Sequence, residues 1–161
     1  MNYISYIERT KAFYAAQGFD VPYQWSQHDD VPFSPMSKRL SDARIGIVTT
    51  AYRDQTTPMM ARQAEAVPTE DAPTNFLNDD LSWDKETTHM ADRRSYFPLE
   101  YLKLGVKSGL IGSLSSRFYF APTQYSQRLT IEQDAPPIDR FAQEDAHDGV
   151  VLLPKQSLIH I

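Results

Sequence analysis

The sequence contains no cysteine and only six glycines among 161 residues. Without a thiol there is no disulfide framework and no thiolate nucleophile. No Walker-type loop and no Gly-x-Gly-x-x-Gly loop follows a predicted strand, which argues against nucleotide or nicotinamide binding through those loops. No apolar run approaches the ~18 residues that a membrane span requires. Residues 1–6 lack the basic and apolar regions of a secretory signal, so we expect a cytoplasmic protein with no membrane partner.

Positive charge is also scarce, with 16 Lys and Arg against 21 Asp and Glu and a formal net charge of −5. Binding to nucleic acid needs a concentrated basic face, so no nucleic-acid partner is expected. Each of the four histidines lacks a His or Cys three to five residues away, and metal-ligand spacing is therefore absent. We expect no metal and no cofactor.

The residues that are present favour one folded domain with much loop. Hydrophobic residues make up 41% and charged residues 23%, a globular balance, while eleven prolines indicate irregular segments. We expect a single α/β domain over 1–161. It would comprise an N-terminal helix and extended arm over 1–43, a sheet core over 44–154 and a short tail over 155–161.

Hydrophobic periodicity predicts alternating strands and helices. Arg44–Ala51 is the clearest strand, because it is apolar nearly throughout, as in a strand covered on both faces. Residues 52–94 show no sustained period and are predicted as a loop. The other expected elements are helices over 4–17, 98–108, 126–134 and 138–146, an extended arm over 21–35, and a strand over 111–118. Residues 149–154 form an apolar run and are expected to be a strand of the buried type. Pro136 and Pro137 are expected to separate the two helices around them.

This order of elements predicts right-handed crossovers and a small, mostly parallel three-layer α/β sheet with long irregular loops. The strand over 149–154 has no covering helix after it. One side of the sheet is therefore expected to need a partner protein.

Polar residues that follow predicted strands are the candidate binding site, because open α/β sheets bind ligands at the carboxyl ends of their strands. Thr50 and Arg53 follow the first strand. Arg117, Thr123 and Arg128 lie in the segment after the second, and two guanidinium groups there can bind a carboxylate through paired hydrogen bonds. Surface salt bridges and core rings are the alternative interpretation. The serines of the Gly112–Arg117 segment lack the pattern of a nucleophile elbow and are read as a turn.

Several collinear phrases resemble the glycine/sarcosine/betaine/D-proline reductase selenoprotein-B-like family, over about residues 31–154. The phrases are Val31–Pro35, Arg44–Ala51, Thr88–Asp92, Phe97–Leu102, Gly109–Leu114, Pro122–Thr123, Gln127–Arg128, Glu132–Pro136 and Glu144–Pro154. Each phrase alone is short, and it is their order and spacing that carry the resemblance.

The resemblance implies a cytoplasmic subunit that attacks the carbon bearing a leaving amine with a selenocysteine or cysteine, beside a pyruvoyl-bearing partner and a thiol reductant. In that family the reactive residue follows the strand that matches 149–154. Here Lys155–Ile161 contains neither sulfur nor selenium, and the family's redox half is missing. The hydroxyl of Ser157 is a far weaker nucleophile than a thiolate. The resemblance also matches His89 to a histidine before the Phe-Pro-Leu helix, which implies a catalytic role in polarising the substrate or holding its carboxylate.

Two functions stay open on these grounds. The first is a subunit or half-domain of a reductase-like complex that binds a small anionic, amino-acid-like substrate through His89, Arg117 and Arg128. A thiol- or selenol-bearing partner would then supply the redox group, and the chain would be an oxidoreductase subunit without its own nucleophile. The second is a non-catalytic binding or scaffold protein derived from that family.

Overall fold

A computed structural model describes residues 5–19, 21, 29–30, 34–53, 57–58, 61–76, 92–122 and 127–153. Contacts within the chain group it into two units, one made of 1–33 with 157–161 and the other of 34–156. The first unit contains α1, Tyr6–Ala16, in agreement with the helix predicted over 4–17. Ile7, Phe13 and Phe19 of this unit are exposed.

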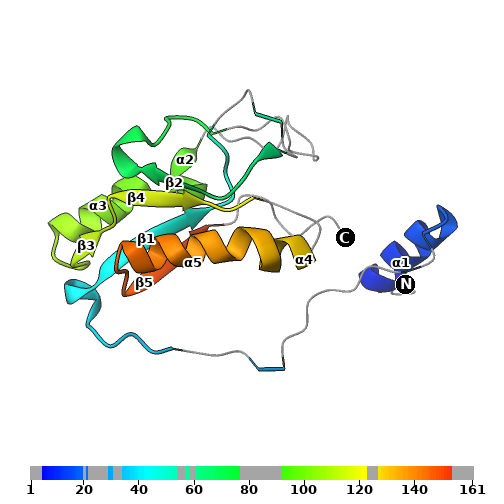
Figure 1. The fold of residues 1–161 in the computed structure, drawn as a ribbon, viewed down its shortest axis with the longest axis horizontal. Helices are drawn as coiled ribbons and strands as arrows, with labels where there is room; N and C mark the ends of the chain where they lie inside the picture. Colours follow the sequence, from blue (N-terminus) through cyan, green and yellow to red (C-terminus); the bar gives the residue numbers. More distant parts are fainter. Residues whose placement is uncertain are drawn as a thin grey trace. The chain divides into compact units, whose positions relative to one another are not determined.

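The second unit is built around a five-stranded mixed sheet (Figure 1). Its strands are β1 (Arg44–Thr49), β2 (Glu65–Pro68), β3 (Ser113–Leu114), β4 (Arg117–Phe120) and β5 (Gly149–Leu153). β1 is central and pairs in parallel with β5 on one edge and with β3 and β4 on the other. β2 pairs antiparallel with β4. The α/β class predicted from the sequence is confirmed, and the sheet is mixed.

β3 and β4 are two pieces of one interrupted strand. Ile45 pairs with Leu114 and Val48 with Tyr119, so β1 advances three residues while the neighbouring chain advances five. The two extra residues, Ser115 and Ser116, form a bulge of the kind that bends a strand. The Ser116 carbonyl accepts a hydrogen bond from the Thr69 backbone N–H at 2.7 Å. The second predicted strand, over 111–118, is therefore found two residues further along the chain, as the two pieces Ser113–Leu114 and Arg117–Phe120.

One face of the sheet packs against an apolar layer that includes α3, Leu99–Lys107. The main buried cluster consists of Ile47, Ala51, Val67, Phe76, Phe97, Leu99 and Phe118. Leu102 of α3 packs against this cluster, and both Leu102 and Val106 pack against a second cluster around Ile45. This agrees with the helix predicted over 98–108. α3 is followed by Gly109 with a φ of +77°, which agrees with the predicted stop.

The other face of the sheet packs against α5, Ala135–Glu144. Tyr119 of β4 points to this face, and its ring contacts that of Phe141 on α5. The short helix α4, Gln127–Leu129, and a π-helical turn, Thr130–Asp134, run directly into α5. The predicted break at Pro136 and Pro137 is therefore wrong. Both prolines lie in the first turn of α5, where missing N–H donors cost little, and the wide turn before them accommodates their rings.

Two further expectations need correction. The predicted loop over 52–94 contains β2, a 3₁₀ turn over Thr69–Asp71 and the start of the short helix α2, Arg93–Tyr96. β2 is only four residues long and ends in proline, so its sequence shows no alternation of apolar and polar residues from which a strand could be predicted. β5 is not a strand covered on both faces, because Val150 is 43% exposed and Leu152 is 63% exposed.

Candidate functional site

The carboxyl end of β1 leads into a cluster of aromatic and charged side chains. Tyr52 is buried, and its ring contacts that of Phe120, at the carboxyl end of β4, with centroids 4.5 Å apart. The Tyr52 hydroxyl donates to Glu65 Oε1 at 3.1 Å. Arg53 Nη2 lies 3.3 Å from Glu65 Oε2, and the guanidinium of Arg62 lies over the Tyr52 ring at 4.5 Å. Two guanidinium groups and one carboxylate therefore meet where an open α/β sheet binds its ligand.

Exposure within this cluster is uneven. The side chain of Arg53 is 48% exposed and that of Glu65 is 30% exposed. Thr50 is half-buried, and its backbone N–H donates to the Leu153 carbonyl of β5 at 3.4 Å. Thr50 and Arg53, both predicted from the sequence, thus lie together at this edge. The Arg53 guanidinium is the group through which an anion in solution can reach the cluster.

Arg117 lies elsewhere. It is the first residue of β4, at the amino end of the parallel strands, and does not follow a strand as the sequence suggested. Its side chain binds Asp145, with Nε to Oδ2 at 3.0 Å and Nη2 to Oδ1 at 2.9 Å. Nη2 also lies 3.2 Å from Glu144. The guanidinium is therefore engaged within the protein.

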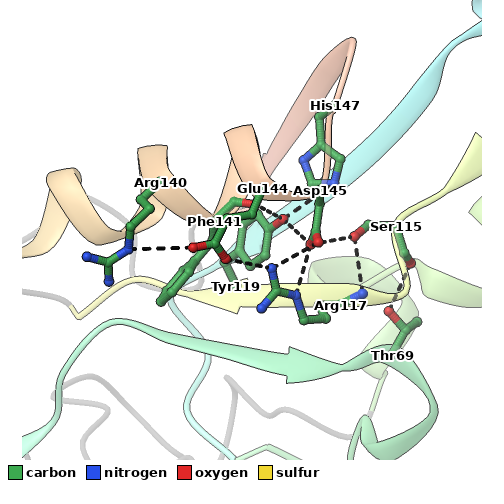
Figure 2. A network of polar contacts seen from close by, with 9 residues as sticks. All are labelled: Thr69, Ser115, Arg117, Tyr119, Arg140, Phe141, Glu144, Asp145 and His147. Carbon is green, nitrogen blue, oxygen red and sulfur yellow. Dashed lines mark hydrogen bonds and ion pairs between the residues drawn. The ribbon is translucent and has the colours of Figure 1, made fainter.

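Asp145 is the centre of a polar network between β4 and the end of α5 (Figure 2). Besides Arg117, it accepts hydrogen bonds from the Tyr119 hydroxyl at 2.6 Å and from Ser115 Oγ at 3.2 Å. The same Tyr119 oxygen lies 2.9 Å from the Phe141 carbonyl. Side chains from the bulge and from β4 thus converge on one carboxylate at the end of α5.

The network shifts the ionisation of its members. Burial opposes ionisation of Asp145, but hydrogen bonds from Arg117 and Tyr119 outweigh it and lower the pKa of Asp145 from 3.8 to about 2. Burial, and then the hydrogen bond to Asp145, raises the pKa of Tyr119 above its ordinary range. At neutral pH the aspartate is therefore charged and the phenol is protonated. The network has the character of a structural ion pair with bound hydroxyls.

His147 joins the network from the turn between α5 and β5. Its ring stacks on Tyr119, with centroids 5.5 Å apart and an interplanar angle of 30°. A methyl group at Gly46 of β1 would collide with Nδ1 and Cε1 of this ring, so glycine is required for the contact. Burial lowers the pKa of His147, and Arg44 lowers it further, against the attraction of Asp145.

Of the remaining predicted residues, the structure describes Arg128, whose ion pair is with a residue of neither cluster. Arg128, on α4, pairs with Glu132 at 2.7 Å and its side chain is 69% exposed. His89 and Thr123 lie outside the described residues. Sequence reasoning did not single out Tyr52, Glu65 or Asp145.

No protein-family model, curated protein or solved structure matches the chain. Among the described residues, no group of three or more His, Cys, Asp or Glu side chains is arranged to hold a metal ion. Within the same part of the chain, no helix has the length and apolar character needed to cross a membrane.

Proposed function

We propose that this chain binds a small anionic, amino-acid-like ligand at the carboxyl edge of its parallel strands, as a cytoplasmic subunit of a reductase-like complex. The redox thiol or selenol would belong to a partner protein, since the chain has no cysteine. In this proposal the sheet is mostly parallel, and α3 and α5 cover its opposite faces in a three-layer arrangement. The role of this arrangement is to expose the carboxyl edge to the ligand. The resemblance to the selenoprotein-B-like reductases supports the ligand class.

The observation that carries the proposal is the half-exposed Arg53 guanidinium paired with Glu65. A ligand carboxylate is chemically equivalent to the Glu65 carboxylate and would compete with it for the same N–H donors. Thr50, the second predicted residue, directly follows β1 at the same carboxyl edge, with its backbone N–H hydrogen-bonded to the Leu153 carbonyl of β5. His89 and Thr123 remain predicted contributors.

Binding of glycine, sarcosine, betaine and D-proline, measured by calorimetry or by NMR shifts, tests the proposal. Arg53→Gln should abolish binding of the carboxylate that binds best. Glu65→Gln should tighten it several-fold, because the arginine loses its internal competitor. Arg140→Gln removes another exposed arginine and should have no effect. Equal affinity in Arg53→Gln and the unaltered protein would contradict the proposal.

A second function, a non-catalytic scaffold, is favoured by the open edge of β5. Among the described residues β5 pairs only with β1, and Leu152 on it is 63% exposed. An edge strand with exposed apolar side chains is a surface for association with another chain.

The two functions are separated by Leu152→Lys. Leu110, which is also 63% exposed but lies after α3, provides the matched control Leu110→Lys. If the chain is a scaffold, Leu152→Lys should lose a protein partner and Leu110→Lys should keep it, and the unaltered protein should bind no carboxylate. The reductase-like subunit predicts carboxylate binding and a partner that contains cysteine or selenocysteine.

A further inference from the structure

The turn between α5 and β5 is held to the sheet in an unusual way. No residue of α5 is fully buried, and its apolar contact with the sheet is made by half-buried side chains such as Phe141, whose ring lies 5.6 Å from that of Tyr119. Beside this contact, the turn after α5 is held by hydrogen bonds from Arg117, Tyr119 and Ser115 to Asp145 and by the packing of the His147 ring (Figure 2). The attachment of this turn to the sheet therefore includes groups that titrate.

The hydrogen bonds around Tyr119 assign the proton of the neutral His147 ring. The single hydroxyl proton of Tyr119 is donated to Asp145, its closest acceptor at 2.6 Å. His147 Nε2 lies 3.4 Å from the same hydroxyl oxygen, so it is assigned as the protonated, donating nitrogen. Nδ1 then carries the lone pair. It is buried and has no hydrogen-bond partner among the described residues.

A second proton on His147 would enter at Nδ1, where the ring edge lies against Gly46. The new N–H would have no acceptor, and the positive charge would be withdrawn from water. The charged groups around the ring act in both directions. Asp145 in the turn and Asp148 before β5 attract the charge, whereas Arg44 of β1 and Arg117 of β4 repel it. Glu144 and Lys38 are engaged with Arg117 and Asp148, respectively.

We propose that this turn is an acid-operated release: when His147 gains its second proton, the turn and α5 separate from the sheet while the α3 face stays folded. Release lets the imidazolium reach water, which the packed ring against Gly46 does not allow. The α3 face contains an apolar core around Phe97, Phe118 and Leu99, so acidification does not weaken it directly.

Amide hydrogen exchange of the full chain at pH 7.5, 6.5 and 5.5, corrected for the intrinsic exchange rate, tests this release. Opening of α5 should increase by up to about tenfold for each pH unit below the ordinary histidine pKa, because one proton is taken up on opening. Protection of α3 should stay unchanged over the same range. Equal loss in both helices, or an unchanged α5, would overturn the proposal.

His147→Gln should remove the pH dependence of α5 opening, since glutamine does not titrate. If that variant fails to fold, His147→Phe keeps a ring over Gly46 and should give the same flat profile. His28→Gln removes a histidine elsewhere in the sequence and should keep the response of the unaltered protein. A retained response in a folded His147 variant rejects the role of this residue.

Discussion

The two faces of the sheet are stabilised by different physics. The α3 face buries a cluster of aromatic and aliphatic side chains with almost no polar atoms, including Phe97 and Phe118 at 1% exposure each. The α5 face has no fully buried helix residue, and beside the Phe141–Tyr119 ring contact it is joined to the sheet by one carboxylate with its arginine and hydroxyl donors. The first face should therefore respond to changes in volume and the second to changes in charge.

The largest effect is expected for Phe118→Ala on the α3 face. It removes a buried ring that contacts Phe97 and Phe76, and such changes cost about 3–5 kcal/mol of unfolding free energy. Phe141→Ala on the half-buried α5 face should cost less than half as much. Denaturant unfolding at pH 7.5 measures both values. Equal losses would mean that the faces do not differ as described.

Asp145→Asn should come next, with a loss of about 2 kcal/mol at pH 7, the free-energy equivalent of the lowered Asp145 pKa. Because the folded pKa of about 2 lies below the ordinary 3.8, this stabilisation is complete well above 3.8 and is lost as the pH falls through 2. Unfolding curves of the variant and the unaltered protein should converge toward that pH. Glu144→Gln changes a 50% exposed partner of the same arginine and should cost less than about 0.5 kcal/mol.

Gly46→Ala should cost about 1 kcal/mol, near the lower end for an overpacked site, because the added methyl group collides with one side chain, that of His147. In the background of His147→Ala the same change should be close to neutral, since the colliding atoms are gone. A double-mutant cycle in urea measures this coupling. Absence of coupling would show that the glycine serves another contact.

Arg128→Gln should have the smallest effect on stability, at most about 0.5 kcal/mol, because its pair with Glu132 is an exposed i,i+4 pair on one helix. Its effect on carboxylate binding is a separate measurement. Loss of binding would show that Arg128 belongs with Arg53 in the ligand site, as the sequence analysis predicted, despite its separate place in the fold.

Much of the fold could be predicted because local patterns agree with the final structure. β1, α3 and β5 are continuous apolar or amphipathic segments, and their bounds were found within two residues. β2 could not be found, because a four-residue antiparallel strand is defined by its pairing with β4. The helix through Pro136 was missed because a π turn, which depends on the surroundings, overrides the rule that proline breaks helices.

The candidate site was predicted in part for a similar reason. Thr50 and Arg53 follow the clearest strand, so their place at its carboxyl end could be derived. Arg117 was assigned to the wrong end, because the bulge before it hid the start of β4. Asp145 and His147 reach Arg117 and Tyr119 only through the fold, across almost 30 residues, and no local pattern indicates such a partner.

The bulge at Ser115 and Ser116 also fixes which side chains each helix meets. It adds an even number of residues, so Leu114 and Phe118 stay on the same side of the sheet. Deleting one serine would turn β4 over, sending Phe118 toward α5 and the Arg117 charge into the aromatic core. Deleting both would preserve the alternation and straighten the strand. Because the insertion has an even number of residues, the charged side chain of β4 stays on the α5 face and Phe118 stays on the α3 face.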